Sequence, residues 1–576
     1  MLVLLGMALF SKPLNSQEDQ TMPTITGSRF FAEAMQAYGV THIFFVPTML
    51  LPALAEMEDM NIRRVMTHGE KAAAYMADGY ARASRRPGIC MAQNVGAANL
   101  AAGLRDAYMA CSPVIAITGG PDSESRYRYL YQEVEDFSMF DPVTKFNARI
   151  DKLSRLPDLL REAFRVATAG APGPVHLEMR GSHGQVIEEE GDLDLIFEEQ
   201  YKQYPAFRPE PEMERIREAA AALTKAQRPV IVAGGGVTSS QAQQEVVQLA
   251  EMLSIPVATS LNGKGTIPDG HPLSVGVVGT YSRWCANRAV AEADLVFFIG
   301  SHTGSQVTNN WKIPRAGTPV IQMDISPADL GRNYPNVVSL LGDAKVTLRR
   351  LIDALKPMEP RTGWVRRVQQ LVSEWRNEVA PLCNSAAVPM RPERICKEIT
   401  EFLPSNAVVV SDTGHSGIWT GAMIDLKKPG QRYIRCAGSL GWAFPASLGI
   451  KCALPDTPVL CFTGDGGFYY HLAELETAAR FGINAVIVVN DNRSLNQETR
   501  LFDAAYGGQQ RGRAREMWVF EDINLAKVAE AMGCFSVRVE QPSDLKPALE
   551  RAFASGKPAV IDAVSDIKAL APRGWS

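Results

Sequence analysis

Short apolar strands alternate with amphipathic helices along nearly the whole chain, and this alternation restricts the possible folds more than any other feature. Examples are HIFFVP, PVIAITGG and PVHLEM near the start, RPVIVAGGG and DLVFFIG in the middle, and NAVVVSDTG, TPVLCFTGDGG and NAVIVVNDN near the end. Strands that are apolar on both faces and separated by helices predict parallel sheets covered on both sides. The expected fold class is therefore α/β, built from doubly wound parallel sheets.

The chain has 576 residues, which is too long for one hydrophobic core, and we expect three domains. Polar, proline-bearing linkers predict an N-terminal domain over 24–188, a central Rossmann-like domain over 205–356 and a C-terminal domain over 370–576. We interpret residues 1–23 as a disordered, dispensable extension. Its apolar opening is far shorter than a membrane span and lacks the basic flank of a signal peptide.

Charge and cysteine content narrow the partners that this chain could have. With 59 Lys and Arg against 63 Asp and Glu, the net charge is −4 and no basic run stands out. Nucleic acid and anionic membrane surfaces are therefore not expected as partners. Nine scattered cysteines without a CxxC pair indicate reduced thiols and favour a cytoplasmic location. The expected partner is a small molecule.

Polar groups follow two neighbouring strands of the predicted C-terminal sheet. Asp465 comes directly after the strand PVLCFT, and Asn492 comes after INAVIVV. Because the carboxyl ends of parallel strands lie at the same edge of a sheet, the two side chains can meet. Together with the backbone carbonyl of Ser494, they offer Mg²⁺ the oxygen ligands that it prefers. Gly466 and Gly467 begin the intervening helix and leave their N–H groups open to an anion. The segment predicts a metal and a diphosphate.

This pattern resembles the thiamine diphosphate signature of the acetolactate synthase and 2-oxo acid decarboxylase family. GDG is followed by an asparagine 27 positions after its aspartate, from 465 to 492. THGEKAAAYMADGYARA, YQEVEDFSMFDPVTKF, SLNGKGTIPDGHPLSVG and GSLGWAFPASLGIKCA also match family segments in the same order. The resemblance covers residues 24–565 and implies a pyrimidine-binding, a central and a diphosphate-binding domain.

The resemblance implies roles for matching residues. Glu70 would bond N1′ of the cofactor's aminopyrimidine and favour the tautomer that removes the C2 proton. Gly438 would lie in the turn that holds the pyrimidine, and Leu440 would support the bent cofactor conformation. His415, with its neighbours Gly414 and Ser416, would belong to a second diphosphate loop.

Family architecture also implies an assembly. It places the cofactor between the N-terminal domain of one subunit and the C-terminal domain of its partner. We therefore expect a homodimer in which Glu70 and Asp465 meet only across the interface, and a tetramer built from such dimers.

The sequence departs from its relatives around the expected substrate pocket. Thr48, Met49 and Leu50 replace the residues usually found after the first strand, and they suggest an apolar pocket. Gln132 is kept, as in acetolactate synthases, and is a candidate to orient a carboxylate or carbonyl. Glu498 lies six residues after Asn492, where simple decarboxylases carry a proton-donating glutamate.

A nucleotide in the central domain is a further expectation from the resemblance, with FAD and ADP as the candidates. Asp324, at the end of the strand PVIQMD, could hold a ribose, but the flavin-type motif after the central strand is replaced by GSHTGSQVTNNW. The glycine triplet at 234–236 resembles a dinucleotide turn only weakly, because no acidic residue ends the next strand. A vestigial domain without a nucleotide is the alternative.

The function expected is decarboxylation of a 2-oxo acid that depends on thiamine diphosphate and Mg²⁺, with aldehyde release or carboligation to a second carbonyl compound. The alternative is a lyase of the 2-hydroxyacyl-CoA or oxalyl-CoA decarboxylase type, which would use an acyl-CoA. A nicotinamide oxidoreductase and a non-catalytic relative are less favoured. Substrate identity stays open at this stage.

Overall fold

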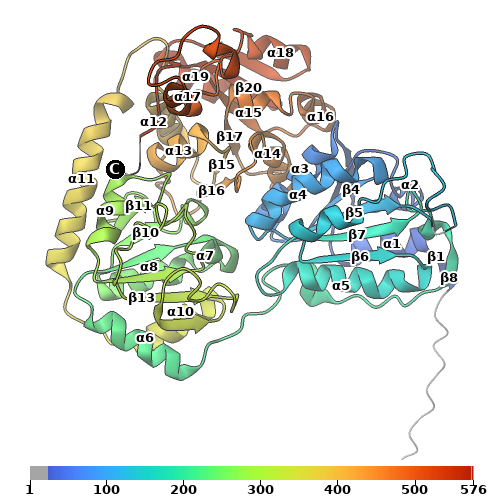
Figure 1. Cartoon of the computed structure of the whole chain (residues 1–576), viewed down its shortest axis with the longest axis horizontal. Helices are drawn as coiled ribbons and strands as arrows, with labels where there is room; N and C mark the ends of the chain where they lie inside the picture. The colour runs from blue at the N-terminus through green and yellow to red at the C-terminus, as the bar shows by residue number, and fades with distance from the viewer. Residues whose placement is uncertain (1–23, 123, 573, 575–576) are drawn as a thin grey trace, which may run out of the picture.

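Three six-stranded parallel sheets, one in each domain, organise the chain (Figure 1). This computed structural model describes residues 24–122, 124–572 and 574, so the predicted extension 1–23 lies outside the described residues. Helices flank every sheet, and the predicted α/β fold class is confirmed. The C-terminal domain, orange to red in Figure 1, lies between the N-terminal domain and the central domain. Among the described helices, none is both long and apolar enough to cross a membrane.

The N-terminal sheet has the strand order β3-β2-β4-β5-β7-β6. A short antiparallel pair, β1 (Thr24–Thr26) with β8 (Glu190–Asp192), carries this domain slightly past the predicted boundary at 188. The other strands are β2 (His42–Phe45), β3 (Arg63–Met66), β4 (Gly88–Ala92), β5 (Val114–Gly120), β6 (Phe146–Ile150) and β7 (Val175–Arg180). The helices are α1 (Gly27–Ala37), α2 (Leu51–Glu56), α3 (Glu70–Ser84), α4 (Ala97–Met109) and α5 (Leu156–Thr168).

The central sheet has the order β11-β10-β9-β12-β13-β14, the arrangement of a dinucleotide-binding fold. Its strands are β9 (Pro229–Ala233), β10 (Val257–Thr259), β11 (Ser274–Val277), β12 (Leu295–Ile299), β13 (Val320–Asp324) and β14 (Asn336–Leu341). Its helices are α6 (Met213–Lys225), α7 (Gly235–Ser240), α8 (Gln243–Leu253), α9 (Trp284–Glu292) and α10 (Ala344–Ala354).

The C-terminal sheet, β16-β15-β17-β18-β20-β19, repeats the connectivity of the N-terminal sheet strand for strand. Its strands are β15 (Val408–Ser411), β16 (Arg432–Arg435), β17 (Val459–Gly464), β18 (Val486–Asp491), β19 (Phe535–Val539) and β20 (Ala559–Val564). Its helices are α12 (Pro392–Phe402), α13 (His415–Met423), α14 (Ala443–Ala453), α15 (Asp465–Tyr469), α16 (Glu474–Phe481), α17 (Thr499–Ala505), α18 (Leu525–Ala531) and α19 (Leu545–Ala554).

The segment predicted to link the last two domains is largely a helix, α11 (Thr362–Cys383). The Arg361 guanidinium donates to the carbonyl oxygens of Ala226, Leu253 and Leu223. The indole of Trp364 donates to the carbonyl oxygen of Pro229, with a distance of 2.9 Å. These contacts anchor the start of α11 on the central domain.

Helices α3 and α14 dock the N-terminal domain onto the C-terminal domain (Figure 1). They approach closely because each carries a glycine at the contact. A Cβ at Gly79 would clash with the backbone of Ala446, and a Cβ at Gly449 would clash with the backbone of Met76. This docking places α4 next to the loop that follows β16 in the C-terminal sheet.

Candidate active site

The loops that carry the predicted cofactor residues lie at the point where the strand order of the C-terminal sheet reverses. Strand β15 has β16 on one side and β17 on the other, and all three run parallel. In open α/β sheets, ligands bind at such switch points, outside the carboxyl ends of the strands. Gly414 follows β15 and Asp465 follows β17, so both predicted diphosphate loops lie at this position.

The predicted metal ligands come together through Ser494. The Ser494 N–H donates to Asp465 Oδ2 at 3.0 Å, and its hydroxyl donates to Asn492 Oδ1 at 2.7 Å. Asp465, Asn492 and Ser494 are 2%, 5% and 4% exposed. The structure therefore gathers a carboxylate, an amide oxygen and a turn of backbone in one buried place, as the sequence predicted.

The electrostatics of this cluster fit a cation. Burial, and then the neighbouring Asp491, raise the pKa of the Asp465 carboxyl well above its usual value. Asn490 Oδ1 and Asp491 Oδ2 are buried without hydrogen-bond partners among the described residues. Among all the residues that the structure describes, no group of three or more His, Cys, Asp and Glu side chains is placed to hold a metal. A divalent ion here would thus rely on one carboxylate together with amide and carbonyl oxygens, which suits Mg²⁺.

Glycines allow the closing loops to pack tightly around this cluster. A Cβ at Gly466 would press on Leu495, and one at Gly467 would lie 2.9 Å from Thr463 Oγ1. Gly414 has φ +64°, a backbone conformation that favours glycine, and it is the N-cap residue directly before α13. The predicted glycines therefore have a packing role whether or not an anion binds to them.

His415 and its neighbour Ser416 begin α13, and the His415 ring is already engaged on both sides. Its Nδ1 lies 2.7 Å from Asn496 Oδ1, while the Ala571 N–H donates to Nε2 at 3.4 Å. Burial lowers the pKa of His415. The ring is therefore neutral, and the loop can offer an anion its backbone N–H groups rather than this side chain.

A carboxylate from the N-terminal domain holds the predicted pyrimidine-binding turn, which we define as residues 437–443. Asp106, on α4 and fully buried, accepts the N–H groups of Ala437, Gly438 and Ser439 at 2.7, 3.0 and 2.9 Å. The Arg82 guanidinium donates a hydrogen bond to Asp106 Oδ1 at 3.3 Å and so helps to hold this carboxylate in place. Sequence reasoning missed Asp106, because nothing in its own segment points to a turn more than 300 residues away.

A second carboxylate, Asp412, holds the other half of this turn. Its Oδ1 accepts the N–H of Gly441 at 3.1 Å, its Oδ2 accepts that of Ala443 at 3.4 Å, and Oδ2 also accepts the Thr463 hydroxyl at 3.1 Å. Burial raises the pKa of the Asp412 carboxyl from 3.8 to about 6. Between the two carboxylates, Gly438 is exposed and Leu440 is only partly buried, although leucine is usually found in a core.

Glu70 begins α3, and its described contacts are with its own domain. Asn99 donates to Glu70 Oε2 at 3.2 Å, and a Cβ at Gly96 would lie 2.5 Å from Oε1. Gly96 therefore leaves room for the carboxylate. Within one chain, no described hydrogen bond joins Glu70 to Asp465 or to the pyrimidine-binding turn.

The predicted substrate residues do not converge in the single chain. Met49 and Leu50 are fully buried in the N-terminal core, whereas Thr48 is exposed. Gln132 lies in the loop after β5, and its backbone carbonyl oxygen accepts a hydrogen bond from Asn94 Nδ2 at 2.6 Å. Glu498 is partly exposed before α17.

Sequence reasoning also missed Gln497, which lies one residue before Glu498 and next to the predicted diphosphate loop at Gly414. Its buried Oε1 has no described partner, and a Cβ at Gly414 would lie only 2.8 Å from it.

Comparison with known proteins agrees with this arrangement. Three models match in order: the N-terminal TPP binding domain of thiamine pyrophosphate enzymes over 25–139, their central domain over 216–351 and their C-terminal TPP binding domain over 412–563. A probable acetolactate synthase large subunit of Methanocaldococcus jannaschii is 34% identical over 94% of this chain and 92% of its own length. The chain belongs to the thiamine pyrophosphate enzymes of the acetolactate synthase family.

Other relatives of this thiamine pyrophosphate enzyme carry two different names. A probable acetolactate synthase large subunit of Methanococcus aeolicus is 31% identical over 94% of this chain and 92% of its own. A glyoxylate carboligase of Escherichia coli is 30% identical over 90% of this chain and 89% of its own. Family membership and dependence on thiamine diphosphate are therefore shown, but the names of the relatives do not agree on one substrate.

Replacing Asp106 with alanine should weaken cofactor binding by this thiamine pyrophosphate enzyme. The change removes one acceptor from three backbone N–H groups, and each unsatisfied buried donor costs about 1–3 kcal/mol. We expect thiamine diphosphate affinity to fall by roughly tenfold to a hundredfold, measured by calorimetry, together with a lower Tm. Asp106→Asn should recover part of the affinity, and an unchanged affinity in Asp106→Ala would show that the turn does not depend on this carboxylate.

Cofactor affinity should fall in acid as Asp412 becomes protonated. A neutral carboxyl is a weaker acceptor, so the dissociation constant should rise about tenfold by one pH unit below the pKa of about 6. Stability of the cofactor-free protein should change in the opposite direction. Because the folded-state pKa is raised, the Asp412 contribution is present below about pH 4 and is lost as the pH rises through about 6. Calorimetry across this range checks the prediction, and Asp412→Asn should flatten the profile.

Proposed function

We propose that this enzyme decarboxylates a 2-oxo acid with thiamine diphosphate and Mg²⁺, followed by aldehyde release or by carboligation to a second carbonyl compound. The observation that carries the proposal is the buried cluster of Asp465, Asn492 and Ser494 beside a turn held by Asp106 and Asp412. The names of the relatives, acetolactate synthase and glyoxylate carboligase, support the reaction class.

The residues of this chain would divide the work between binding and proton control. Asp465, Asn492 and the Ser494 carbonyl would hold the metal, and the backbone around Gly414 and Gly466 would receive the diphosphate. When bound, thiamine diphosphate supplies a nucleophilic carbon and an acceptor for the electrons released with CO₂. Glu70 would hold a proton at the aminopyrimidine, and the apolar side chain of Leu440 would fix the cofactor's shape.

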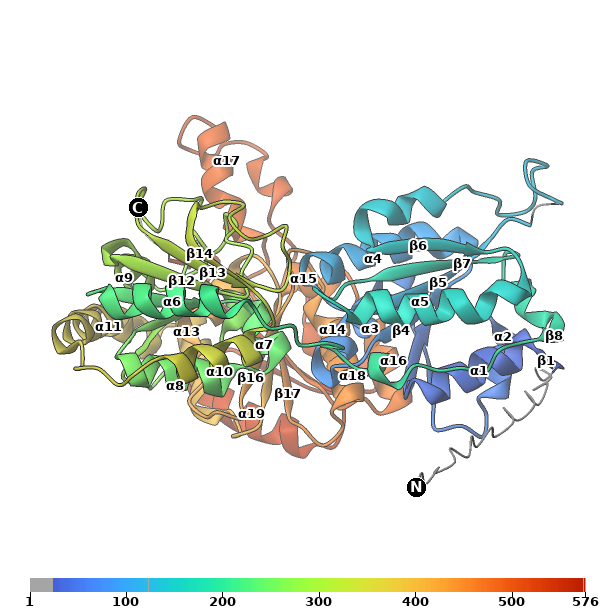
Figure 2. The same cartoon turned by 90° about the horizontal axis from the view of Figure 1, so that it is seen from below.

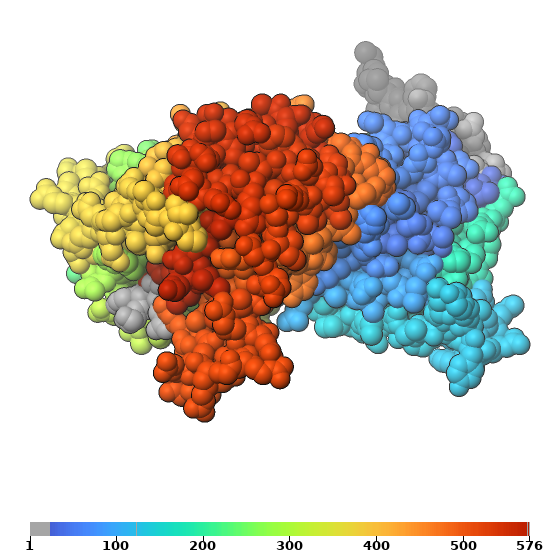
Figure 3. All heavy atoms as spheres, turned by 90° about the horizontal axis from the view of Figure 1, so that it is seen from above, coloured from blue at the N-terminus to red at the C-terminus, as the bar shows by residue number. Residues whose placement is uncertain are grey.

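We also propose that two copies of the chain form the complete site, since Glu70 and Asp465 belong to opposite sides of the predicted interface. Several large apolar side chains on the N-terminal domain are exposed in the single chain, which supports an assembly. They lie in and after the loop that projects from β5 in Figures 2 and 3, and they are Tyr127, Tyr129, Tyr131, Val134 and Met139. Segment 494–520, with α17, projects on the same side of the molecule in both views. Sedimentation of the holoenzyme would test for the homodimer and for the tetramer built from it.

Product identification would test the proposed reaction. The purified enzyme, saturated with thiamine diphosphate and Mg²⁺, should release CO₂ from at least one member of a panel of 2-oxo acids, including pyruvate and glyoxylate. Mass spectrometry of the products separates aldehyde release from carboligation. Turnover of acyl-CoA thioesters alone would favour the 2-hydroxyacyl-CoA lyase or oxalyl-CoA decarboxylase type, and turnover of neither class would contradict the proposal.

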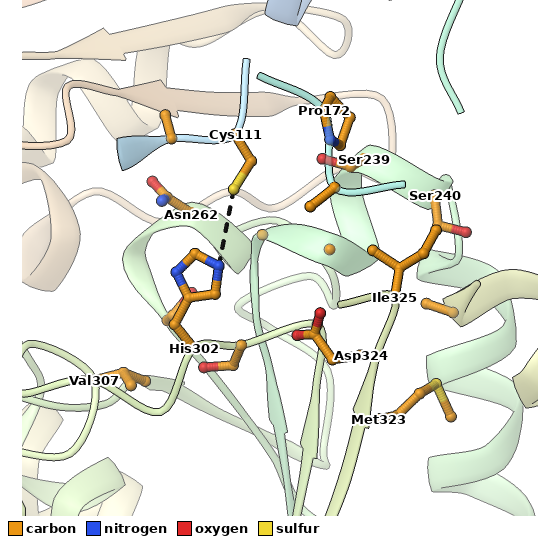
Figure 4. A pocket seen from close by; sticks show the side chains of 18 of the residues that line it. Cys111, Pro172, Ser239, Ser240, Asn262, His302, Val307, Met323, Asp324 and Ile325 are labelled. Carbon is orange, nitrogen blue, oxygen red and sulfur yellow. Dashed lines mark hydrogen bonds between the residues drawn. The ribbon is translucent and has the colours of Figure 1, made fainter. Parts of the chain in front are cut away.

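FAD or ADP in the central domain stays a prediction. Asp324 lies at the end of β13, is 7% exposed and accepts the N–H of Ser326 at 3.0 Å, and it lines a cavity at the carboxyl ends of the central strands (Figure 4), where open α/β sheets bind ligands. The visible spectrum of the purified protein would show a flavin, and mass spectrometry of the released ligands would show ADP.

A further inference from the structure

Glu474, at the start of α16, is a buried carboxylate that the proposed function leaves without a role. It is 2% exposed, and both of its hydrogen-bond partners are uncharged groups. Its Oε2 accepts the hydroxyl of Thr477 at 2.8 Å, and its Oε1 accepts the backbone N–H of His68, in the N-terminal domain, at 3.1 Å. Burial raises the pKa of the Glu474 carboxyl, and these two hydrogen bonds act against that shift. Burying a carboxylate is costly, so its contact with the His68 backbone requires an explanation.

This contact lies on the loop of residues 67–69, which joins β3 to α3 and ends directly before Glu70. Gly69 is the N-cap residue of α3, but it has no side chain with which to cap the helix. A Cβ at Gly69 would meet no atom within 4 Å, so packing does not hold the loop at this point. The hydrogen bond from the His68 N–H to Glu474 ties the loop to the C-terminal domain immediately before the helix that carries Glu70.

Side chains near the surface of α16 also contact this part of the N-terminal domain. Arg480 donates to the carbonyl oxygen of Met66 at 3.0 Å, and Glu476 Oε2 lies 2.8 Å from His68 Nε2. The side chains of Arg480, Glu476 and His68 are 30%, 44% and 41% exposed. Water screens such contacts, and exposed ion pairs contribute little to a structure. Glu474 is shielded from water, so its hydrogen bond to the loop is the stronger restraint.

Both partners of this contact belong to one chain. Helix α16 lies against β3, at the border between the C-terminal and N-terminal domains and near α3 (Figure 1). Helices α15 and α16 follow each other, so the segment that carries Asp465 also supports the loop before Glu70. The contact is therefore present in each subunit whether or not a partner is bound.

We propose that Glu474 is a positioning residue that holds the backbone before α3, so that the Glu70 carboxylate meets the aminopyrimidine of the cofactor. This proposal rests on the function proposed above for Glu70. Displacing a catalytic group by about 1 Å can cost about a hundredfold in rate, and the loop has little else to hold it beside Glu70. Glu474 acts through Glu70 and takes no proton itself.

Exchange of the C2 proton tests the proposal on the holoenzyme, at saturating thiamine diphosphate and Mg²⁺. Glu474→Gln keeps the length of the side chain and an oxygen that accepts the His68 N–H, so its exchange rate should stay close to that of the unmodified enzyme. Glu474→Asp keeps the charge but withdraws the oxygen, and Glu474→Ala removes it. Both should slow exchange by about tenfold to a hundredfold, while calorimetry should show that cofactor affinity is retained.

Two further variants separate positioning from a general loss of structure. Because Glu474 acts through Glu70, adding Glu474→Ala to Glu70→Gln should slow exchange no further than Glu70→Gln alone. Glu476→Ala is the matched control, since it removes the exposed contact with the His68 ring and leaves the His68 N–H bonded. It should exchange the C2 proton at the unmodified rate. If Glu474→Ala does not fold, Glu474→Asp carries the test, because it retains a carboxylate in the same buried place.

The proposal is overturned if Glu474→Ala and Glu474→Asp exchange the proton at the unmodified rate. It is also overturned if Glu474→Gln is as slow as Glu474→Asp, or if Glu474→Ala slows exchange just as much when Glu70 is already glutamine. These results differ from a failure of the proposed function. Unmodified exchange in Glu70→Gln alone would show that Glu70 lacks its role, and both proposals would then fall.

Discussion

Glu70→Gln should keep thiamine diphosphate bound but lose exchange of the cofactor's C2 proton. Glutamine preserves the size of the side chain and its contact with Asn99, but it cannot hold the proton that a carboxyl group holds. Loss of a positioned acid or base typically costs 10²–10⁴-fold in rate, roughly the loss expected here. Gly96, which leaves space beside the carboxylate, accommodates either side chain, so the variant should fold normally.

Hydrogen–deuterium exchange at C2, followed by NMR after rapid quenching, measures this effect directly. Calorimetry of the same samples reports cofactor binding, and Glu359→Gln, at an exposed position outside the site, is the matched control. Wild-type exchange in Glu70→Gln would show that the assigned role is wrong. Loss of cofactor binding would instead show that Glu70 holds the cofactor in place.

Asp465→Asn should weaken cofactor binding and at the same time raise the stability of the cofactor-free protein. The variant loses the one carboxylate in the predicted metal set, and changes in supporting residues alone often cost about 10–100-fold in metal affinity. We therefore expect Mg²⁺-dependent affinity for thiamine diphosphate to fall by more than about a hundredfold. Cofactor-free Asp465→Asn should have a higher Tm near neutral pH, because it removes a buried charge repelled by Asp491.

The sign of the stability effect follows from the raised pKa of Asp465. A raised folded-state pKa means that stability is lost as pH rises and the carboxyl ionises. The Tm gain of the asparagine variant should therefore shrink in acid. Calorimetry with and without Mg²⁺ measures affinity, and Asp353→Asn, at an exposed aspartate on α10, is the control. Unchanged cofactor affinity would contradict the metal site, and an unchanged Tm would contradict the repulsion.

Local patterns predicted the sheets and the closeness of Asp465 and Asn492 because the information needed lay within single segments. The apolar strands before Asp465 and Asn492 fixed both residues at one sheet edge, and the structure joins them through Ser494. The predicted linker after residue 188 contains a strand that its composition did not indicate, since β8 pairs with β1 across more than 150 residues. Polar composition in that segment indicated exposure but could not indicate a distant strand partner.

The residues that sequence reasoning missed act over long distances. Asp106 is a buried aspartate in an ordinary helical pattern, and its partners are on another domain. Asp412 follows a strand at the same sheet edge as Asp465, a signal that could have identified it. Met49 and Leu50 show how apolar character can be read in two ways: it suggested a substrate pocket, and in the single chain both side chains are buried in the N-terminal core. Composition alone does not separate these two environments.

The turn over residues 437–443 also has a consequence for biosynthesis. One of its two anchoring carboxylates is made early, on α4, and the turn itself is made more than 300 residues later. A newly made C-terminal domain therefore lacks a finished cofactor site until it docks against α3 and α4. Loading of the cofactor would then report that the domains have assembled correctly. Chains whose domains are misplaced would stay in the apo form, less protected by ligand binding and more open to proteolysis.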